Sequence, residues 1–470
     1  MEKKPIVQIV LGLIANFSSL APSMSLGFSA IALPWLLADG NPERLSESQA
    51  SWFASIASVA TPIGCLVAGS ISDRYGRRMT LMVINVVCLI GWIMIVIAYY
   101  VQSCQYALLM VGRVFTGLST GLGSMAPTVY MAEVSTPKLR GMFITWTALS
   151  FASGVLLVYM FGWIAKANWG TTAMLCAAFP CVGFLATWIF LVESPSWLVT
   201  KNRLEEAKRS MCRLFGAKEC DEKIHQEVES LMTSTQRLNV NDDNLKFEEF
   251  LKPTFFKPFI IISSFFFFQQ FSGVFVIVFY AVDIVNEVKV SVDPYLAICL
   301  IATMRVIGSV SVSVLSKRFG RRPLSLVSGA GMTITMISLA GYLILTQEKN
   351  MQAQPWLPLT LLMGYFFIST LGFLSLPFGM AAEVFPSKLR GIATGATTCL
   401  AYTFSFITVK TYPTMIRTMG NYKLFLFYGG TALFGTIFVA IFLPETKGKT
   451  LKEIERYFDK RSEGDKPEKV

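Results

Sequence analysis

The chain has 470 residues, of which 53% are hydrophobic and 15% are charged, and its mean hydropathy is +0.53. Soluble domains usually carry about 25% charged residues, so this composition excludes an ordinary soluble enzyme and, at the other extreme, a disordered chain. The net charge of +11 does not indicate a nucleic-acid partner, because Lys and Arg lie in short groups between long apolar runs. These features predict one multi-pass membrane protein.

Twelve apolar runs of membrane-spanning length follow one another along the chain. The first six are expected at 7–35, 49–71, 80–101, 105–132, 142–165 and 171–192. The second six are expected at 257–285, 293–316, 324–345, 356–383, 391–415 and 422–443. We therefore expect an all-α membrane protein of two six-helix halves. The expected boundaries are 1–193 for the N-terminal half, 194–256 for a cytoplasmic linker with short amphipathic helices, 257–443 for the C-terminal half and 444–470 for a cytoplasmic tail.

The distribution of basic residues predicts the orientation of the chain. Lys and Arg concentrate at the start, after the second, fourth, eighth and tenth spans, in the linker and in the tail, whereas the opposite loops carry isolated cations. Both termini and the linker are therefore expected to be cytoplasmic. The first apolar run is followed by no small-residue cleavage site, so we expect a retained helix rather than a signal peptide.

Two motifs occur once in each half, at matching places. The segment 73–78, which reads DRYGRR after the second span, has a counterpart at 317–322, which reads KRFGRR after the eighth. The segment 132–141 after the fourth span has a counterpart at 382–391 after the tenth. Two similar halves that face the same way indicate parallel repeats, and transporters of this kind bind substrate near the midplane between their repeats.

The arginines of these motifs have acidic residues as candidate partners at the expected cytoplasmic helix ends, namely Glu133, Glu193 and Glu383. Ion pairs that form in one state and break in the other would bias a rocking motion. A single Gly-Arg-Arg loop would indicate no more than arginines that fix topology. The repeat, the acids and Arg113 within the fourth span together favour a cytoplasmic gate.

Two adjacent amides, Gln269 and Gln270, lie in the first half of the seventh span. Amides in a membrane need polar partners, and each can both donate and accept hydrogen bonds to a polyhydroxyl ligand. Hydrogen bonding between helices is the other interpretation. Gly273 and nearby aromatics such as Tyr280 would let this helix bend around a substrate or would serve in packing.

Arg305 lies in the middle of the eighth span, at the depth where a charge costs most. It is expected to contact a substrate, or to form a structural ion pair within the C-terminal half. The nearest acids in the sequence, Asp283 and Glu287, lie toward the outer end.

The sequence contains no catalytic triad, nucleotide-binding loop or metal-ligand spacing, so we expect no enzyme, cofactor or metal. No acidic residue occurs in the first span between Ile6 and Leu37. This absence favours facilitated diffusion over proton coupling.

The series of motifs resembles the sugar porters of the major facilitator superfamily over nearly the whole chain, and most of all the insect facilitated trehalose transporters. The motifs that carry the resemblance are 73–78, Gly112-Arg113, 133–141, Glu193-Ser194-Pro195, 269–273, 383–391 and 444–448. The resemblance implies alternating access around a cavity lined by helices 1, 4, 7 and 10, and a place in the plasma membrane. We expect a monomer in the lipid bilayer with a sugar-like solute as its partner.

The residue patterns and the resemblance together give the expected site residues. The cytoplasmic gate is expected to comprise Asp73, Arg77, Arg78, Arg113, Glu133, Arg140, Glu193, Arg321, Arg322, Glu383, Arg390 and Glu445. The substrate-binding residues are expected to be Gln269, Gln270, Phe275, Tyr280, Arg305, Phe378 and Tyr402.

This chain departs from the family pattern at several cavity positions. Sugar porters usually carry Asn where Phe275 and Arg305 stand, and Trp at the positions of Phe378 and Tyr402. The expected cavity is therefore more aromatic and carries a cation. The leading hypothesis is a facilitative carrier of a sugar such as trehalose or a hexose. The alternatives are a carrier of an organic anion that uses Arg305, and a sugar sensor that does not transport.

Overall fold

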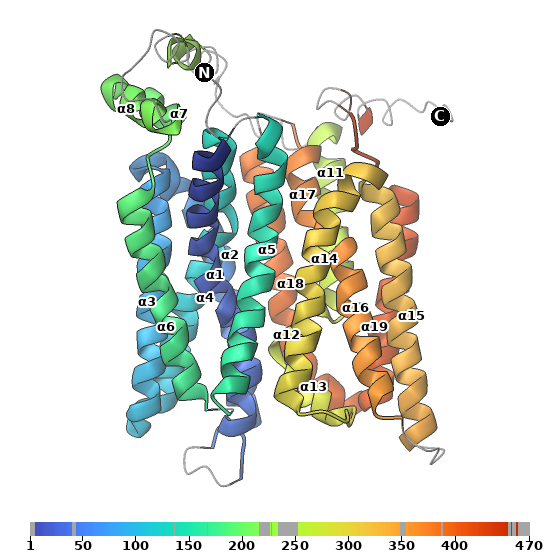
Figure 1. Ribbon diagram of the computed structural model, residues 1–470. Helices are drawn as coiled ribbons and strands as arrows, with labels where there is room; N and C mark the ends of the chain where they lie inside the picture. Colours follow the sequence, from blue (N-terminus) through green and yellow to red (C-terminus); the bar gives the residue numbers. More distant parts are fainter. Residues whose placement is uncertain are drawn as a thin grey trace. The chain divides into compact units, whose positions relative to one another are not determined.

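The computed structural model describes residues 5–39, 44–135, 137–166, 168–215, 226, 228–233, 252–347, 354–386, 389–449, 453 and 457–458. These residues form helices and connecting loops, with no strand among them (Figure 1). Ten helices within this part of the chain are long and apolar enough to cross a membrane. The prediction of an all-α, multi-pass membrane protein is confirmed.

The first six expected spans are each one helix. Their bounds are α1 Pro5–Leu36, α2 Glu47–Tyr75, α3 Arg77–Tyr100, α4 Gln105–Val134, α5 Pro137–Ile164 and α6 Trp169–Phe190, with the 3-10 turn η1 Gln102–Cys104 before α4. Two short helices follow, α7 Pro195–Thr200 and α8 Leu204–Phe215. Ser194 caps α7 by accepting a hydrogen bond from the Trp197 N–H at 3.3 Å, and Pro195 fits the first helical position.

The later spans include two that are not continuous. The helices are α11 Pro253–Phe271, α12 Val274–Phe279, α13 Ala281–Glu287, α14 Pro294–Phe319, α15 Arg321–Gln347, α16 Trp356–Leu371, α17 Leu376–Val384, α18 Arg390–Met419 and α19 Asn421–Phe442. The expected run 257–285 is divided into α11, α12 and α13, and the run 356–383 into α16 and α17. The first break lies at Gly273, whose φ of +90° is left-handed. Glycine adopts this backbone conformation readily because it has no side chain.

The contacts group the chain into two compact units. The first comprises Met1–Leu26, Ile63–Val158 and Gly170–Leu245, and the second comprises Gly27–Pro62, Tyr159–Trp169 and Lys246–Val470. The outer parts of α1 and α2 and the end of α5 thus belong to the second unit.

Each unit is held together by helices that pack lengthwise. In the first unit α3 and α4 pack along each other, and a Cβ at Gly91 would lie only 2.9 Å from the Gly112 carbonyl oxygen. Small residues at such contacts allow close backbone approach, which drives helix association in membranes. In the second unit α15 packs along α19, α14 along α16 and α11 along α18 (Figure 1). Aromatic rings fill the α11 contacts, with Phe265 and Phe373 edge to face at 5.1 Å.

Candidate functional site: two ion clusters and a broken helix

The first unit contains an ion cluster at the start of α3, formed by Asp73, Arg77, Arg78, Glu133 and Glu193, which we call the first cluster. The opening N–H groups of a helix have no partner within the helix. The Glu193 carboxylate fills that role, since it accepts hydrogen bonds from the N–H groups of Arg77 at 2.8 Å and Arg78 at 3.2 Å. The Arg77 guanidinium contacts both Glu133 oxygens and also pairs with Asp73 at 3.1 Å. The first cluster therefore ties the ends of α2, α4 and α6 to the start of α3.

Burial affects the chemistry of Glu193. Burial raises the pKa of its carboxyl above the ordinary value, against the lowering effects of the backbone N–H groups and of Arg77. The second role of this carboxylate is to fill the space beside Gly76, whose φ of +102° begins the turn into α3. A side chain at Gly76 would collide with it, because a Cβ there would lie 2.4 Å from Glu193 Oε2.

The second unit contains a matching ion cluster at the start of α15, formed by Arg321, Arg322, Glu383 and Glu445, which we call the second cluster. Glu445 accepts hydrogen bonds from the N–H groups of Arg321 and Arg322, each at 3.0 Å. The Arg321 guanidinium pairs with Glu383 at 2.6 Å. Burial acts to raise the pKa of the Glu445 carboxyl, but hydrogen bonds from four backbone N–H groups together lower it below its ordinary value.

The structure does not bring every expected gate residue into these clusters. Arg113 lies 20 positions before Glu133 on the continuous helix α4, a rise of roughly 30 Å. It is fully buried, and its guanidinium donates hydrogen bonds to the backbone and side-chain oxygens of Ser25 in α1. Arg113 therefore lies apart from the first cluster and contacts α1 instead.

Two further gate candidates stand apart from the second cluster's described contacts. Arg390 begins α18, and two of its guanidinium nitrogens are buried without a hydrogen-bond partner among the described residues. Arg140 lies in the first turn of α5, but its side chain falls outside the described part of the chain.

The two amides of the seventh span have different surroundings. The Gln269 side-chain N–H donates to the carbonyl oxygens of Phe373 at 2.8 Å and Leu374 at 2.9 Å, which lie in the break between α16 and α17. The Gln270 N–H donates to Gln269 Oε1 at 3.2 Å, whereas Gln270 Oε1 is buried with no partner among the described residues. Gln269 thus satisfies a broken helix, and Gln270 presents a free acceptor.

The breaks in the seventh span leave carbonyl groups that side chains from other helices satisfy. The Tyr159 hydroxyl in α5 donates to the Val278 carbonyl at 2.7 Å, and the Ser29 hydroxyl in α1 donates to the Phe279 carbonyl at 3.0 Å. The Tyr365 hydroxyl in α16 donates to the Ser272 carbonyl at 2.8 Å. An unpaired backbone group inside a membrane costs several kcal/mol, so these hydroxyls hold the interrupted helix in place. Sequence reasoning missed all three.

Three tyrosines gather around the outer part of this broken helix. The Tyr280 ring lies 4.5 Å from the Tyr412 ring, and a Cβ at Gly273 would lie 2.6 Å from the Tyr428 ring. The hydroxyls of Tyr280 and Tyr428 are buried and have no hydrogen-bond partner among the described residues. Tyr280 was expected at the site, whereas Tyr412 and Tyr428 were not, although a hydroxyl inside a span is a weak signal of this kind.

The remaining expected residues lie in the second unit. Arg305 in α14 is 6% exposed, and its guanidinium is within electrostatic reach of the Tyr159 and Tyr402 hydroxyls. The Phe378 ring lies 6.5 Å from the Tyr402 ring and 4.8 Å from the Phe266 ring. Phe275 is buried in α12. The chain therefore places the Arg305 guanidinium near the Tyr402 hydroxyl, and the Tyr402 ring near the Phe378 ring.

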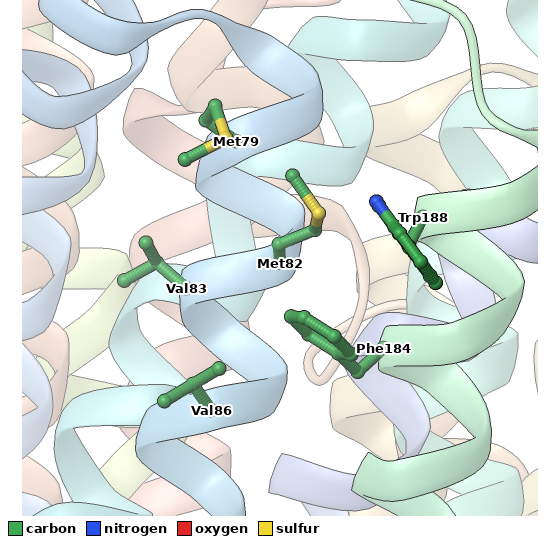
Figure 2. A pocket seen from close by; sticks show the side chains of 6 residues that line it. All are labelled: Met79, Met82, Val83, Val86, Phe184 and Trp188. Atoms are coloured by element: carbon green, nitrogen blue, oxygen red, sulfur yellow. The ribbon is translucent and has the colours of Figure 1, made fainter.

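An apolar groove lies elsewhere, between α3 and α6 of the first unit. Figure 2 shows its lining, and its volume is about 370 Å³. The lining residues are Met79, Met82, Val83, Val86, Phe184 and Trp188. None of the expected substrate-binding residues is among them, and a wholly apolar lining suits a hydrocarbon chain rather than a sugar. Within the described residues, no group of three or more His, Cys, Asp or Glu side chains could hold a metal ion.

Comparison with known proteins gives consistent results. The sequence profile of the Sugar (and other) transporter family matches residues 16–458. The facilitated trehalose transporter Tret1 of Bombyx mori is 30% identical over 445 residues, which cover 94% of this chain and 86% of that protein. Tret1 of Apis mellifera ligustica is 28% identical over 457 residues, which cover 96% and 88%.

A solved structure of the xylose transporter XylE from E. coli, in an inward open conformation, superposes with a TM-score of 0.77 and 22% identity and covers 96% of this chain and 99% of that chain. Another structure of XylE is described as a major facilitator superfamily protein and has a TM-score of 0.75 at 21% identity, with 96% and 99% covered. These likenesses confirm the predicted major facilitator fold. The family profile and the silkworm relative together establish that this chain belongs to the sugar (and other) transporter family.

Proposed function

We propose that this protein is a carrier that moves a sugar across the membrane by alternating access and facilitated diffusion. The observation that carries the proposal is the interrupted seventh span, in which the backbone opens at Gly273 and Gln270 Oε1 is buried without a partner among the described residues. Transporters of this architecture build substrate sites from discontinuous helices near the midplane. Open acceptors and hydroxyls in such a place match the donors and acceptors of a polyol.

The proposed contacts divide into positioning residues and solute-binding residues. The Gln269 side-chain N–H group donates both of its hydrogen bonds to the α16–α17 break, so Gln269 positions this region. Gln270 and Tyr280 each have a buried oxygen without a partner among the described residues and are proposed to contact sugar hydroxyls. Phe378 and Tyr402 offer aromatic faces to the C–H faces of a sugar ring.

The two clusters are the proposed gate elements on the cytoplasmic side. Each combines a helix start with charges from three or more segments, and such networks have two discrete arrangements rather than a continuum. Breaking and reforming them would bias the rocking motion. The proposed solute is a sugar, which binds and is released as the equilibrium between the two states of the carrier shifts.

The proposal also covers the location of the protein and its oligomeric state. The basic loops support cytoplasmic termini. The proposal also includes a place in the plasma membrane and a monomer, with the bilayer and a small solute as its partners. The proposed activity is transport without catalysis, and nucleic acid has no role in it.

Uptake by proteoliposomes tests this proposal. The full chain is reconstituted, and the uptake of labelled trehalose and glucose is measured with and without a protonophore. We expect saturable uptake that survives the protonophore. Uptake that collapses with the proton gradient would contradict facilitated diffusion, and folded protein without uptake of any sugar would contradict the carrier function.

A further inference from the structure

Arg305 is a cation in the middle of a membrane span for which the protein supplies no counter-ion in its described part. Arg305 is only 6% exposed, and its Nη1 nitrogen is buried with no hydrogen-bond partner among the described residues. No ion pair joins it to an acid among the described residues. A charge at this depth is expensive unless a partner of opposite sign is present.

The acids nearest in sequence are engaged elsewhere. Glu287 accepts a hydrogen bond from the Asn421 side chain at 2.6 Å. Asp283 lies within electrostatic reach of Tyr280, Tyr295 and Tyr412. Neither acid contributes to the electrostatic surroundings of Arg305. The sequence-based alternative of a structural ion pair with these acids is therefore not supported.

The neighbours of Arg305 complete a distinct environment. The Tyr159 hydroxyl donates its hydrogen bond to the Val278 carbonyl, so its oxygen can offer Arg305 only lone pairs. Tyr402 supplies the other nearby hydroxyl, and its ring lies 6.5 Å from that of Phe378. The Arg305 guanidinium, whose buried Nη1 has no partner among the described residues, thus lies near aromatic surfaces that suit a sugar ring.

The single positive charge of Arg305 indicates the charge that its ligand should carry. A single carboxylate balances a single guanidinium and matches its planar fork with two parallel hydrogen bonds. A phosphate ester carries about two negative charges at neutral pH, so one charge would remain buried and unpaired. A neutral sugar would leave the cation itself unpaired.

We propose that Arg305 binds the carboxylate of an acidic sugar, such as a hexuronate, while the aromatic rings of Phe378 and Tyr402 contact the sugar ring. This assignment rests on the proposed carrier function and names the solute class for the same site. It makes Arg305 the specificity-determining residue for charge.

The test compares solutes that share a hexose ring and differ in the charge that they carry. Proteoliposomes with the full wild-type chain are given glucuronate, its uncharged methyl ester, glucose or glucose 6-phosphate. We expect glucuronate to be preferred over the methyl ester by about 10- to 100-fold in kcat/KM, the effect of one charge-assisted contact. Arg305→Asn should lose this preference, whereas Arg305→Lys should retain part of it. Arg44→Asn makes the same residue change in an exposed ion pair with Asp39 and should leave the preference unchanged.

The outcomes separate the two levels of the proposal. Equal transport of glucuronate and its methyl ester, or an unchanged preference in folded Arg305→Asn, would overturn the carboxylate assignment but not the carrier. A preference for glucose 6-phosphate would overturn the carboxylate in favour of phosphate. If Arg305→Asn does not fold, the wild-type comparison of glucuronate with its ester still decides the matter. Folded wild-type protein that takes up neither neutral nor acidic sugars would overturn the carrier function itself.

Discussion

Glu193 in the first unit and Glu445 in the second have the same task, because each accepts the first two backbone N–H groups of a helix that begins after a glycine of positive φ. Their carboxyl groups differ in chemistry. Burial dominates at Glu193 and raises its pKa, whereas backbone hydrogen bonds dominate at Glu445 and lower its pKa. Repeated backbone geometry therefore does not impose the same direction of pKa shift on the two carboxyl groups.

The arginine contacts differ in the same direction. Arg77 binds both oxygens of Glu133 and pairs also with Asp73, while Arg321 makes one pair with Glu383. The exposed fractions are 12% and 21% for the first pair and 26% and 36% for the second. At the position that corresponds to Asp73 the second half carries Lys317. The first cluster is thus the more tightly held, and the comparison indicates that the helix-capping carboxylate is the shared element and the outer charges are adjustable.

The largest expected effect comes from Gly76→Ala. A Cβ would lie 2.4 Å from Glu193 Oε2, and φ of +102° is strained for any other residue. We expect a loss of about 3 kcal/mol in the free energy of unfolding, since backbone strain costs roughly 1–3 kcal/mol and a displaced cap about 1 kcal/mol. Gly320→Ala should cost somewhat less, because the Glu445 carboxylate is less buried and can move.

Thermal unfolding of the purified protein in detergent measures these changes. Gly395→Ala is the matched control, because a Cβ at that helical position in α18 meets nothing within 4 Å. Gly76→Ala that unfolds at the wild-type temperature would contradict the assigned role of the Glu193 cap.

The second largest effect is expected when the ion pairs Arg77–Glu133 and Arg321–Glu383 are broken. Removing one partner of a buried pair leaves the other charge unpaired, and partial exposure reduces the cost. We expect Glu133→Gln to cost about 2 kcal/mol and Glu383→Gln about 1 kcal/mol in the same unfolding measurement, because the Arg77 pair is the more buried. Glu206→Gln, which removes an exposed pair between Glu206 in α8 and Arg203 just before it, serves as the control at about 0.3 kcal/mol. Equal costs for the two cluster variants would show that the difference in burial has no energetic consequence.

The pH dependence gives a smaller effect of opposite sign in the two clusters. Because the pKa of Glu193 is raised on folding, its ionised form is disfavoured in the folded protein, and this penalty disappears as the pH falls toward the ordinary glutamate value of 4.5. Because the pKa of Glu445 is lowered, its stabilising contribution is present above pH 4.5 and is lost as the pH falls through its folded value.

Unfolding temperatures measured across this range test the sign. On acidification the wild type should gain stability relative to Glu193→Gln and lose stability relative to Glu445→Gln. Parallel curves for the two variants would mean that the two carboxyl groups titrate alike.

Much of this architecture is predictable from sequence because hydrophobic length and repeated motifs are local properties. They gave the spans, and the matching motifs pointed to Arg77, Glu133, Arg321 and Glu383, which the structure brings together in pairs. Arg113 lies apart from these pairs, because the place of a motif in the series does not give its position along the helix. The helical rise of 1.5 Å per residue already separates it from Glu133.

Other features depend on contacts between distant segments. The interruption at Tyr280 has no local sequence signal, since its φ of −119° is open to any residue. It persists because Tyr159 and Ser29 satisfy the carbonyls that it exposes, from helices 119 and 250 positions away. The engagement of Gln269 with Phe373 and Leu374 likewise requires the second broken helix to be in place.

The smallest expected effect comes from giving position 73 the lysine that the second half carries at the corresponding position, 317. Asp73→Lys removes the pair with Arg77, but the Asp73 side chain is 77% exposed, so we expect a change below about 0.5 kcal/mol. The Trp197 indole N–H donates to the backbone carbonyl of residue 73 at 3.0 Å, and this contact survives the substitution. Raising the salt concentration from about 0.05 M to about 0.5 M should remove the remaining difference in unfolding temperature, because exposed charges are screened. A loss as large as that of Glu133→Gln would place Asp73 among the essential charges and would mean that the two clusters differ in more than their exposed charges.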